Sequence, residues 1–173
     1  MIVIITGASH TGKTRLAQIL MEQYRYPYVC EDHIKMGLIR SGYTNLTPED
    51  DDEMTEYLWP VIREMIKTAI ENNQNLIVEG CYVPFDWQDD FSEEYLEKIK
   101  YICLCLSKEY IESHIEDILK NESCIEARLD DGYCTIEKLI RENSIYFEGC
   151  KKYNLEPVVI ENDYVETIGK ITL

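Results

Sequence analysis

The residues with the clearest chemical use lie near the amino terminus, where positions 7–14 read Gly-Ala-Ser-His-Thr-Gly-Lys-Thr. They fit the phosphate-binding pattern Gly-x-x-x-x-Gly-Lys-Thr at every fixed position. The two glycines permit backbone angles and close approaches that a Cβ would obstruct, so successive amides can turn inward around phosphate oxygens. The lysine can reach the β- and γ-phosphates, and the last hydroxyl can bind magnesium. The pattern predicts a nucleotide held by Gly7, Ala8, Ser9, His10, Thr11, Gly12, Lys13 and Thr14.

The flanking residues fit this interpretation. A run of β-branched residues at 2–5 is typical of a strand buried on both faces, and an apolar pattern at helical spacing follows the loop. The dinucleotide-binding turn of short-chain dehydrogenases also begins Thr-Gly-Ala-Ser. However, Thr11 stands where that pattern needs glycine, and no tyrosine is followed four places later by a lysine. The phosphate-binding loop, or Walker A motif, is therefore favoured.

Two carboxylates follow predicted strands and could assist phosphoryl transfer. Glu79 ends the run Leu-Ile-Val at 76–78, where an acid can bind magnesium through its water ligands, or could cap the next segment. Asp32 follows a short strand at 26–30 and could take a proton from an acceptor hydroxyl, or could be the N-cap of a helix beginning near Ile34. Both alternatives stay open for each residue.

Cations that could stabilise the transferring phosphoryl group come later in the chain. Arg128 lies in a polar stretch at about 121–135, where a mobile lid would close over the nucleotide, and Arg141 is the second choice. Either could instead pair with a nearby acid such as Glu137. Three more cations could hold an anionic acceptor or could be solvated helix charges: Lys35, Arg40 and Arg63.

The elements that must position these residues alternate between strand and helix. Strands are predicted at 2–5, 26–30, 76–80, 101–106 and 157–160, and helices include 108–120 and 136–153. Thr47 and Pro48 resemble a helix start, and a proline at position 60 predicts a kink or a restart. This alternation predicts an α/β fold, a parallel sheet covered on both faces, with ligands at the carboxyl ends of the strands.

Composition limits the partners of the chain. It has 173 residues, a length suited to one domain, and a formal net charge of −16, which argues against nucleic acid and membrane surfaces. No apolar run is long enough to span a bilayer, so we expect a cytoplasmic protein. The seven cysteines do not form a disulfide framework, and their spacing does not favour zinc.

Together, GASHTGKT, the Glu-Asp-His after the second strand, LIVEG and a lone lid arginine resemble the small P-loop kinases, especially zeta-toxin, chloramphenicol phosphotransferase and 2-phosphoglycerate kinase-like proteins, a group related to adenylate kinases. This resemblance implies one three-layer α/β/α P-loop NTPase domain over residues 1–173, with a five-stranded parallel sheet in the order 2-3-1-4-5. It also implies phosphate binding by Lys13 and Thr14, a base at Asp32, a magnesium acid at Glu79, and lid cations at Arg128 and Arg141.

The sequence departs from the adenylate kinases, because Glu-Gly-Cys-Tyr-Val-Pro at 79–84 replaces their Asp-Gly-Phe-Pro-Arg run. We therefore expect an enzyme that uses ATP and Mg²⁺ to phosphorylate a hydroxyl of a small-molecule acceptor. The alternatives are a nucleoside or nucleotide kinase and a regulatory NTPase switch, although no Asn-Lys-x-Asp guanine-binding motif is present. The sequence does not identify the acceptor, the choice between ATP and GTP, or the oligomeric state.

Overall fold

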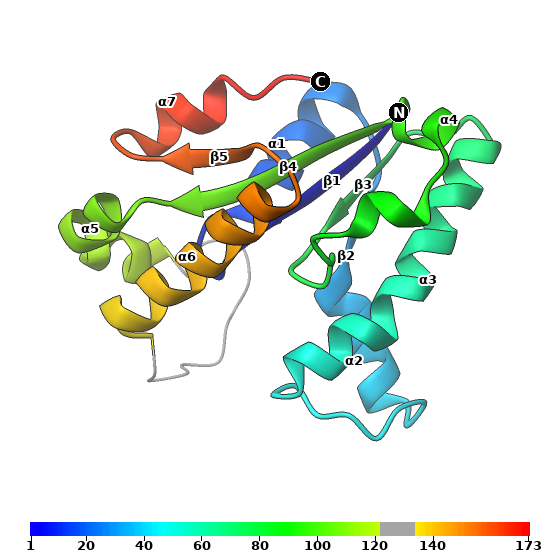
Figure 1. The fold of residues 1–173 in the computed structure, drawn as a ribbon, viewed down its shortest axis with the longest axis horizontal. Helices are drawn as coiled ribbons and strands as arrows, with labels where there is room; N and C mark the ends of the chain where they lie inside the picture. The colour runs from blue at the N-terminus through cyan, green and yellow to red at the C-terminus, as the bar shows by residue number, and fades with distance from the viewer. Residues whose placement is uncertain (122–133) are drawn as a thin grey trace.

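The computed structural model describes residues 1–121 and 134–173, and it contains one five-stranded parallel sheet (Figure 1). The strand order is β2-β3-β1-β4-β5, as the resemblance implied. β1 is central and pairs with β3 on one side and β4 on the other. The strands are β1 (Ile2–Gly7), β2 (Tyr28–Cys30), β3 (Leu76–Glu79), β4 (Ile99–Leu106) and β5 (Pro157–Ile160).

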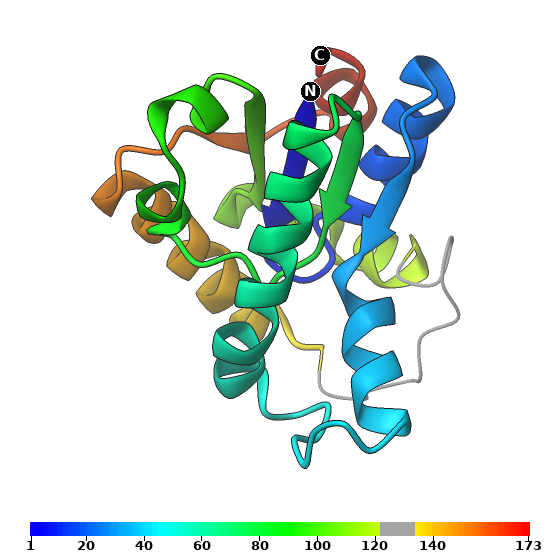
Figure 2. The same ribbon diagram turned by 90° about the vertical axis from the view of Figure 1, so that its right-hand side faces the viewer.

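Helices cover both faces of this sheet, which makes a three-layer α/β/α fold (Figures 1 and 2). The 3₁₀ turn η1 (Trp87–Asp90) also lies between β3 and β4. The helices are α1 (Lys13–Tyr24), α2 (Glu31–Arg40), α3 (Asp51–Glu71), α4 (Glu93–Leu96), α5 (Lys108–Asn121), α6 (Ile136–Lys152) and α7 (Tyr164–Gly169).

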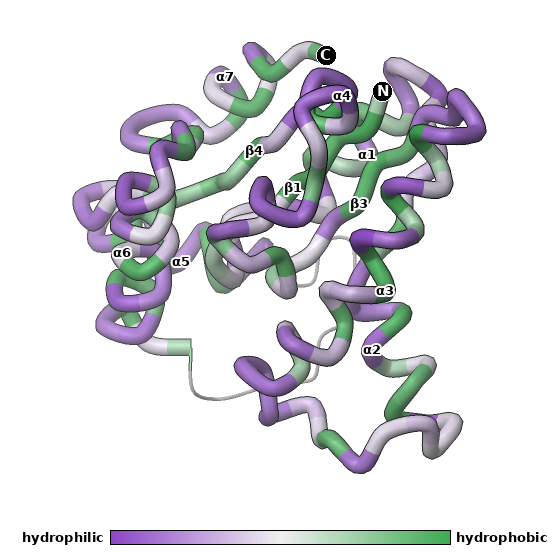
Figure 3. Tube along the Cα trace, turned by 45° about the vertical axis from the view of Figure 1, so that its right-hand side comes forward, coloured by the Kyte–Doolittle hydropathy of each residue, from purple (hydrophilic) through white to green (hydrophobic). Residues whose placement is uncertain are grey.

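The alternation of side chains along β1 divides the apolar interior into two cores. Ile2 and Ile4 face a core shared with α3 and the carboxyl-terminal half of α6, whereas Val3 and Ile5 face a core shared with α1, α5 and α7. All four side chains are fully buried, as a central parallel strand requires. Hydrophobic segments accordingly concentrate along the strands and hydrophilic segments on the outer helices (Figure 3). In the described residues, no helix combines the length and apolarity needed to cross a bilayer.

Several predicted boundaries were wrong. The helix expected near Ile34 begins directly after β2 at Glu31, and α3 begins at Asp51 instead of at Pro48. The backbone N–H and hydroxyl of Thr47 donate to Asp50 Oδ2 at 2.8 and 2.9 Å, so Thr47 closes a turn before the helix. Pro60 lies inside α3, which continues through it without a restart, because packing of the buried face holds the helix together.

The connection from β3 to β4 contains η1 and α4. Its aromatic residues pack in different places. Tyr82 lies in a small core with Met54 and Leu58, and Phe85 packs edge-on against Tyr146 of α6. Trp87 stacks on Tyr101 of β4 at 5.3 Å between ring centroids. The residues after β3 therefore connect the α2–α3 side of the molecule to α6.

Candidate functional site

The turn after β1 forms the phosphate-binding loop that its sequence predicts. Gly7, Gly12 and His10 all have positive φ, at 138°, 82° and 64°. A Cβ on Gly7 would lie 2.1 Å from the carbonyl oxygen of Leu104 on β4, and one on Gly12 would lie 1.8 Å from the Tyr164 hydroxyl. Only glycine fits either position without displacing its neighbours. The loop is thus shaped by the β4 backbone at Gly7 and by the Tyr164 side chain at Gly12.

Lys13 is the first residue of α1 and lies across this loop. Its Nζ donates to the carbonyl oxygen of Ala8 at 2.9 Å, and the Thr11 hydroxyl donates to the same oxygen at 2.9 Å. The Lys13 side chain is largely buried. The ammonium and the first amides of α1 therefore lie at one place, a combination that favours an anion.

Glu79 meets the phosphate-binding loop from the next strand. β1 and β3 pair in parallel with Ile5 opposite Glu79, which places the carboxylate beside the start of α1. The Thr14 hydroxyl donates to Glu79 Oε1 at 3.1 Å, and Glu79 is only 2% exposed. A hydroxyl and a carboxylate are the hard oxygen ligands that Mg²⁺ prefers. These two residues, predicted together from sequence, fit a magnesium ion carried by a nucleotide.

Two carboxyl groups follow β2. Asp32 lies in the first turn of α2 and is half-buried; the N-cap position belongs to Cys30, so the N-cap interpretation of Asp32 was wrong. Glu31 is fully buried, and its Oε2 accepts a hydrogen bond from the Tyr82 amide at 2.8 Å. A Cβ on Gly80 would lie 2.1 Å from the same oxygen. Glu31 therefore joins the end of β2 to the residues that follow β3.

The pKa of Glu31 is raised to about 7, mainly because burial removes water from its carboxylate. The nearby charges of Glu79 and Asp32 raise it further, whereas the Tyr82 amide and Lys13 lower it. The four ionisable groups Lys13, Glu31, Asp32 and Glu79 thus lie close enough to influence one another. The fold brings the ends of β1, β2 and β3 together in one site.

Glu31 was missed from sequence because the helix was expected to begin three residues later. Beginning at Glu31, α2 places residues 31 and 35 on the same face, four positions apart. Lys35 is buried and bonds to the Tyr82 hydroxyl, so both residues flank Tyr82. The spacing of the acid and the lysine is the signal that could have identified this face.

The structure describes only one of the two arginines predicted to act as lid cations. Arg128 and most of the lid segment lie outside the described residues. Arg141 is exposed in the second turn of α6, and its side chain has no hydrogen bond or ion pair with residues 1–121 or 134–173, so the predicted pairing with Glu137 is not observed there. At the start of the second described range, Cys134 Sγ lies 3.8 Å from Nε2 of His10 in the phosphate-binding loop. The start of α6 therefore lies near the loop.

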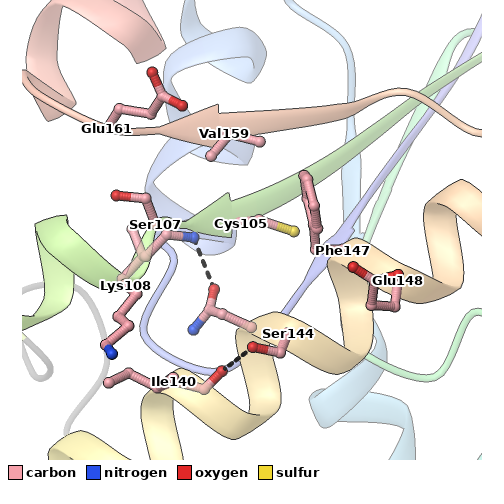
Figure 4. A pocket seen from close by; sticks show the side chains of 11 residues that line it. Cys105, Ser107, Lys108, Ile140, Ser144, Phe147, Glu148, Val159 and Glu161 are labelled. Atoms are coloured by element: carbon pink, nitrogen blue, oxygen red, sulfur yellow. Dashed lines mark hydrogen bonds between the residues drawn. The ribbon is translucent and has the colours of Figure 1, made fainter.

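A pocket of about 250 Å³ lies elsewhere, between α6 and the carboxyl ends of β4 and β5 (Figure 4). It contains Asn143, whose Oδ1 accepts from the Leu106 amide at 2.7 Å and whose Nδ2 donates to the Leu139 carbonyl oxygen. No predicted site residue that the structure describes lines this pocket. Within the described ranges, no group of three or more His, Cys, Asp or Glu side chains is arranged to hold a metal ion.

No family profile matches the chain, and no curated protein is similar to it in sequence. Solved structures with a similar fold include deoxyadenosine kinase from M. mycoides, described with products bound and with dATP bound. It has 16% identity and a TM-score of 0.56, with 98% of this chain and 95% of that chain covered. A sugar kinase from Janibacter sp. HTCC2649 has 14% identity and a TM-score of 0.55, with 98% and 90% covered. At this identity the likeness shows the fold, a P-loop α/β/α sheet in the order 2-3-1-4-5.

Proposed function

We propose that the protein is an ATP- and Mg²⁺-dependent phosphotransferase that transfers the γ-phosphate to a hydroxyl of a small molecule. The observation that carries this proposal is the meeting of three strand ends. The phosphate-binding loop follows β1, and two carboxyl groups follow β2. β3 ends at Glu79, whose carboxylate accepts a hydrogen bond from Thr14. Kinases of nucleosides and of sugars among the structures of similar fold are consistent with it. We keep the narrower resemblance to zeta-toxin and chloramphenicol phosphotransferase within this proposal.

In this proposal the amides of residues 7–14 and the Lys13 ammonium bind the phosphates and hold them in place. Thr14 and Glu79 would hold Mg²⁺, the hydroxyl as a direct ligand and the carboxylate through water. When bound, the ion neutralises charge on the β- and γ-phosphates. Arg128, from the proposed lid at about 121–135, and Arg141, farther along in α6, would contribute positive charge beside the transferring group. Such a reaction draws on the cytoplasmic nucleotide pool, so we retain the cytoplasm as the proposed location.

Asp32 is the proposed general base. It lies at the end of β2, is accessible to solvent, and stands beside the buried Glu31. A hydroxyl acceptor must lose its proton as phosphoryl transfer proceeds, whereas a phosphate acceptor is already an anion. The carboxylate at this position therefore favours a hydroxyl over a phosphate as the acceptor. Glu31 is more deeply buried than Asp32. Because it accepts a hydrogen bond from the Tyr82 amide, it is suited to positioning the residues after β3.

The test is a phosphotransfer assay with labelled ATP and Mg²⁺ against hydroxylated compounds and nucleosides. Asp32→Asn should leave ATP binding nearly unchanged and lower kcat by about 100-fold or more. Asp52→Asn, the same change at an exposed position in α3, is the matched control. Unchanged turnover of Asp32→Asn with the true acceptor would remove it as the base. Slow ATP hydrolysis that no acceptor accelerates, together with nucleotide-dependent binding of a protein partner, would instead favour a regulatory NTPase.

A further inference from the structure

Carboxyl groups surround the residues that follow β3, on the side of the phosphate-binding loop away from β4. Glu31 and Asp32 begin α2, Asp51 begins α3, and Glu79 ends β3. The charges of Asp32 and Asp51 act on both Cys81 and Tyr82, and they add to the effect of burial in raising the pKa of each. These acids, which come from three elements, therefore converge on the same short segment.

The buried cation on this side is fully engaged. The Lys35 ammonium donates to the Pro48 carbonyl oxygen at 2.8 Å, to Asp51 Oδ1 at 3.1 Å and to the Tyr82 hydroxyl. An ammonium has three N–H donors, so these three acceptors use all of them. Asp51 also accepts from the Tyr82 hydroxyl at 2.9 Å and neutralises the charge of Lys35. Lys35 thus holds the start of α3 against α2 and has no donor left for a ligand.

The other basic residues of α2 and α3 are placed away from these acids or are paired. Arg63 pairs with Glu64 and Asp90, and Lys67 pairs with Glu64. Arg40 is exposed in the last turn of α2, about 13 Å along the helix axis from Glu31 at 1.5 Å per residue. None of the three cations proposed from sequence to hold an anionic acceptor is available for it in the described residues.

We propose that the acceptor bears a hydroxyl and no anionic group, so that a nucleoside, a sugar or an amino sugar is accepted, whereas a phosphorylated or carboxylated compound is rejected. This inference rests on the proposed kinase function and narrows its substrate class. Lys13 is the cation of the described residues whose charge acts on Glu31 and Cys81, and in the proposed function it is engaged by the phosphates of ATP. An anionic group on the acceptor would therefore meet mainly the like charges of the carboxyl groups, which disfavours binding. An uncharged polyol meets no such repulsion, and its hydroxyl groups can donate hydrogen bonds to the carboxylates.

Asp51 is then a specificity residue, because it neutralises Lys35. Asp51→Asn keeps the size of the side chain but leaves the Lys35 ammonium without its negative partner. This variant should therefore tolerate an anionic acceptor better than the wild-type protein does. Asp52 is the next residue of the same helix and is exposed, and it has no hydrogen bond or ion pair with residues 1–121 or 134–173. Asp52→Asn changes the net charge equally and serves as the control.

The experiment measures phosphoryl transfer from ATP with Mg²⁺ to pairs of compounds that differ by an anionic group: deoxyadenosine and dAMP, and glucose and gluconate. Where transfer occurs, kcat/KM should be at least tenfold higher for the uncharged member. Asp51→Asn should reduce this ratio about two- to fivefold, because the exposed Asp51 carboxylate is screened by solvent, whereas Asp52→Asn should leave it unchanged. Circular dichroism checks that each variant is folded, and the wild-type ratio tests the inference without either variant.

Equal or preferential transfer to the anionic members would overturn the inference and leave the kinase proposal standing. Equal ratios for Asp51→Asn and Asp52→Asn, with both variants folded, would also overturn the role of Asp51. Failure of both members of every pair, and of a wider set of hydroxylated compounds, would refute the kinase proposal and this inference with it.

Discussion

At the level of single side chains, the site depends on ionisable groups placed where water is largely excluded. Lys13, Glu31 and Glu79 are all less than one-tenth exposed, yet each can carry a charge. Burial makes an uncompensated charge expensive, so each group affects its neighbours more strongly than it would at the surface. Glu31 is the extreme case, because its Oε1 has no hydrogen-bond partner in the described residues.

The stability of the fold should fall as pH rises from about 4.5 to about 7 because of Glu31. Its pKa is about 7 in the folded protein against 4.5 as the ordinary value, so the folded state binds the proton more tightly. Ionisation of the unfolded chain then lowers stability as pH rises, and the loss is complete above pH 7 at about 3 kcal/mol. Glu31→Gln should remove this component, giving a flatter dependence of the urea-unfolding free energy between pH 5 and 8. The same slope in both proteins would contradict the assignment to Glu31.

Lys13→Ala should weaken binding of the nucleotide itself. A hydrogen bond from an ammonium to phosphate contributes about 1.5–3 kcal/mol, which corresponds to a Kd about 10- to 100-fold higher. Isothermal titration calorimetry with ATP and Mg²⁺ measures this change directly. Lys170→Ala is the comparison, because Lys170 is exposed and, among residues 1–121 and 134–173, pairs only with Glu166 on the surface of α7. An unchanged Kd for Lys13→Ala would place the triphosphate elsewhere.

At the level of helices and strands, local sequence patterns predicted the elements whose apolar residues recur at a regular spacing. The strand at 157–160 was predicted residue for residue, and the helices at 108–120 and 136–153 were within one residue at each end. The phosphate-binding loop was predictable because its chemistry is local. The start of α2 was not, since the interior contacts of Glu31 with Tyr82 come from a distant segment. Glu31 itself was missed for the same reason.

Replacing two helical glycines by alanine should change the stability of the protein in opposite directions. Gly37 lies in α2 with open space around the position of a Cβ, so Gly37→Ala should stabilise the protein by about 0.5–1 kcal/mol. Gly149 lies in α6, where a Cβ would come within 2.4 Å of the Phe85 ring, so Gly149→Ala should destabilise it by about 1–3 kcal/mol. Urea unfolding of both variants measures the signs. Stabilisation by both would show that Phe85 does not pack tightly on α6.

At the level of the whole molecule, the excess of acids acts on every part of the structure. The formal net charge is −16, and several surface ion pairs are exposed, such as Lys108 with Glu112. Exposed pairs contribute little, whereas repulsion among many like charges opposes the compact state. The fold therefore depends on its apolar cores to offset this repulsion. The phosphate-binding loop is an exception in this negatively charged molecule, because Lys13 and the amino-terminal end of α1 give it local positive charge.

Salt should accordingly stabilise this protein. As NaCl rises from 10 to 150 mM, the Debye length falls from about 30 Å to about 8 Å, and repulsion across the surface is screened. We expect the midpoint of thermal unfolding to rise over this range and then to level off, as followed by circular dichroism. Equal concentrations of an uncharged solute are the control for non-ionic effects. A falling midpoint would mean that the surface ion pairs outweigh the repulsion.

The parallel pairing of β1 with β3 has one more consequence. Thr14 meets Glu79 because Ile5 lies opposite Glu79 in the sheet, and neighbouring residues of a strand point to opposite faces. Inserting or deleting one residue within β3 would turn the carboxylate to the other side, whereas a change of two residues would restore its orientation. Such an even change still moves the carboxylate about 6.6 Å along the strand, so its contact with the first turn of α1 requires both the face and the register of β3.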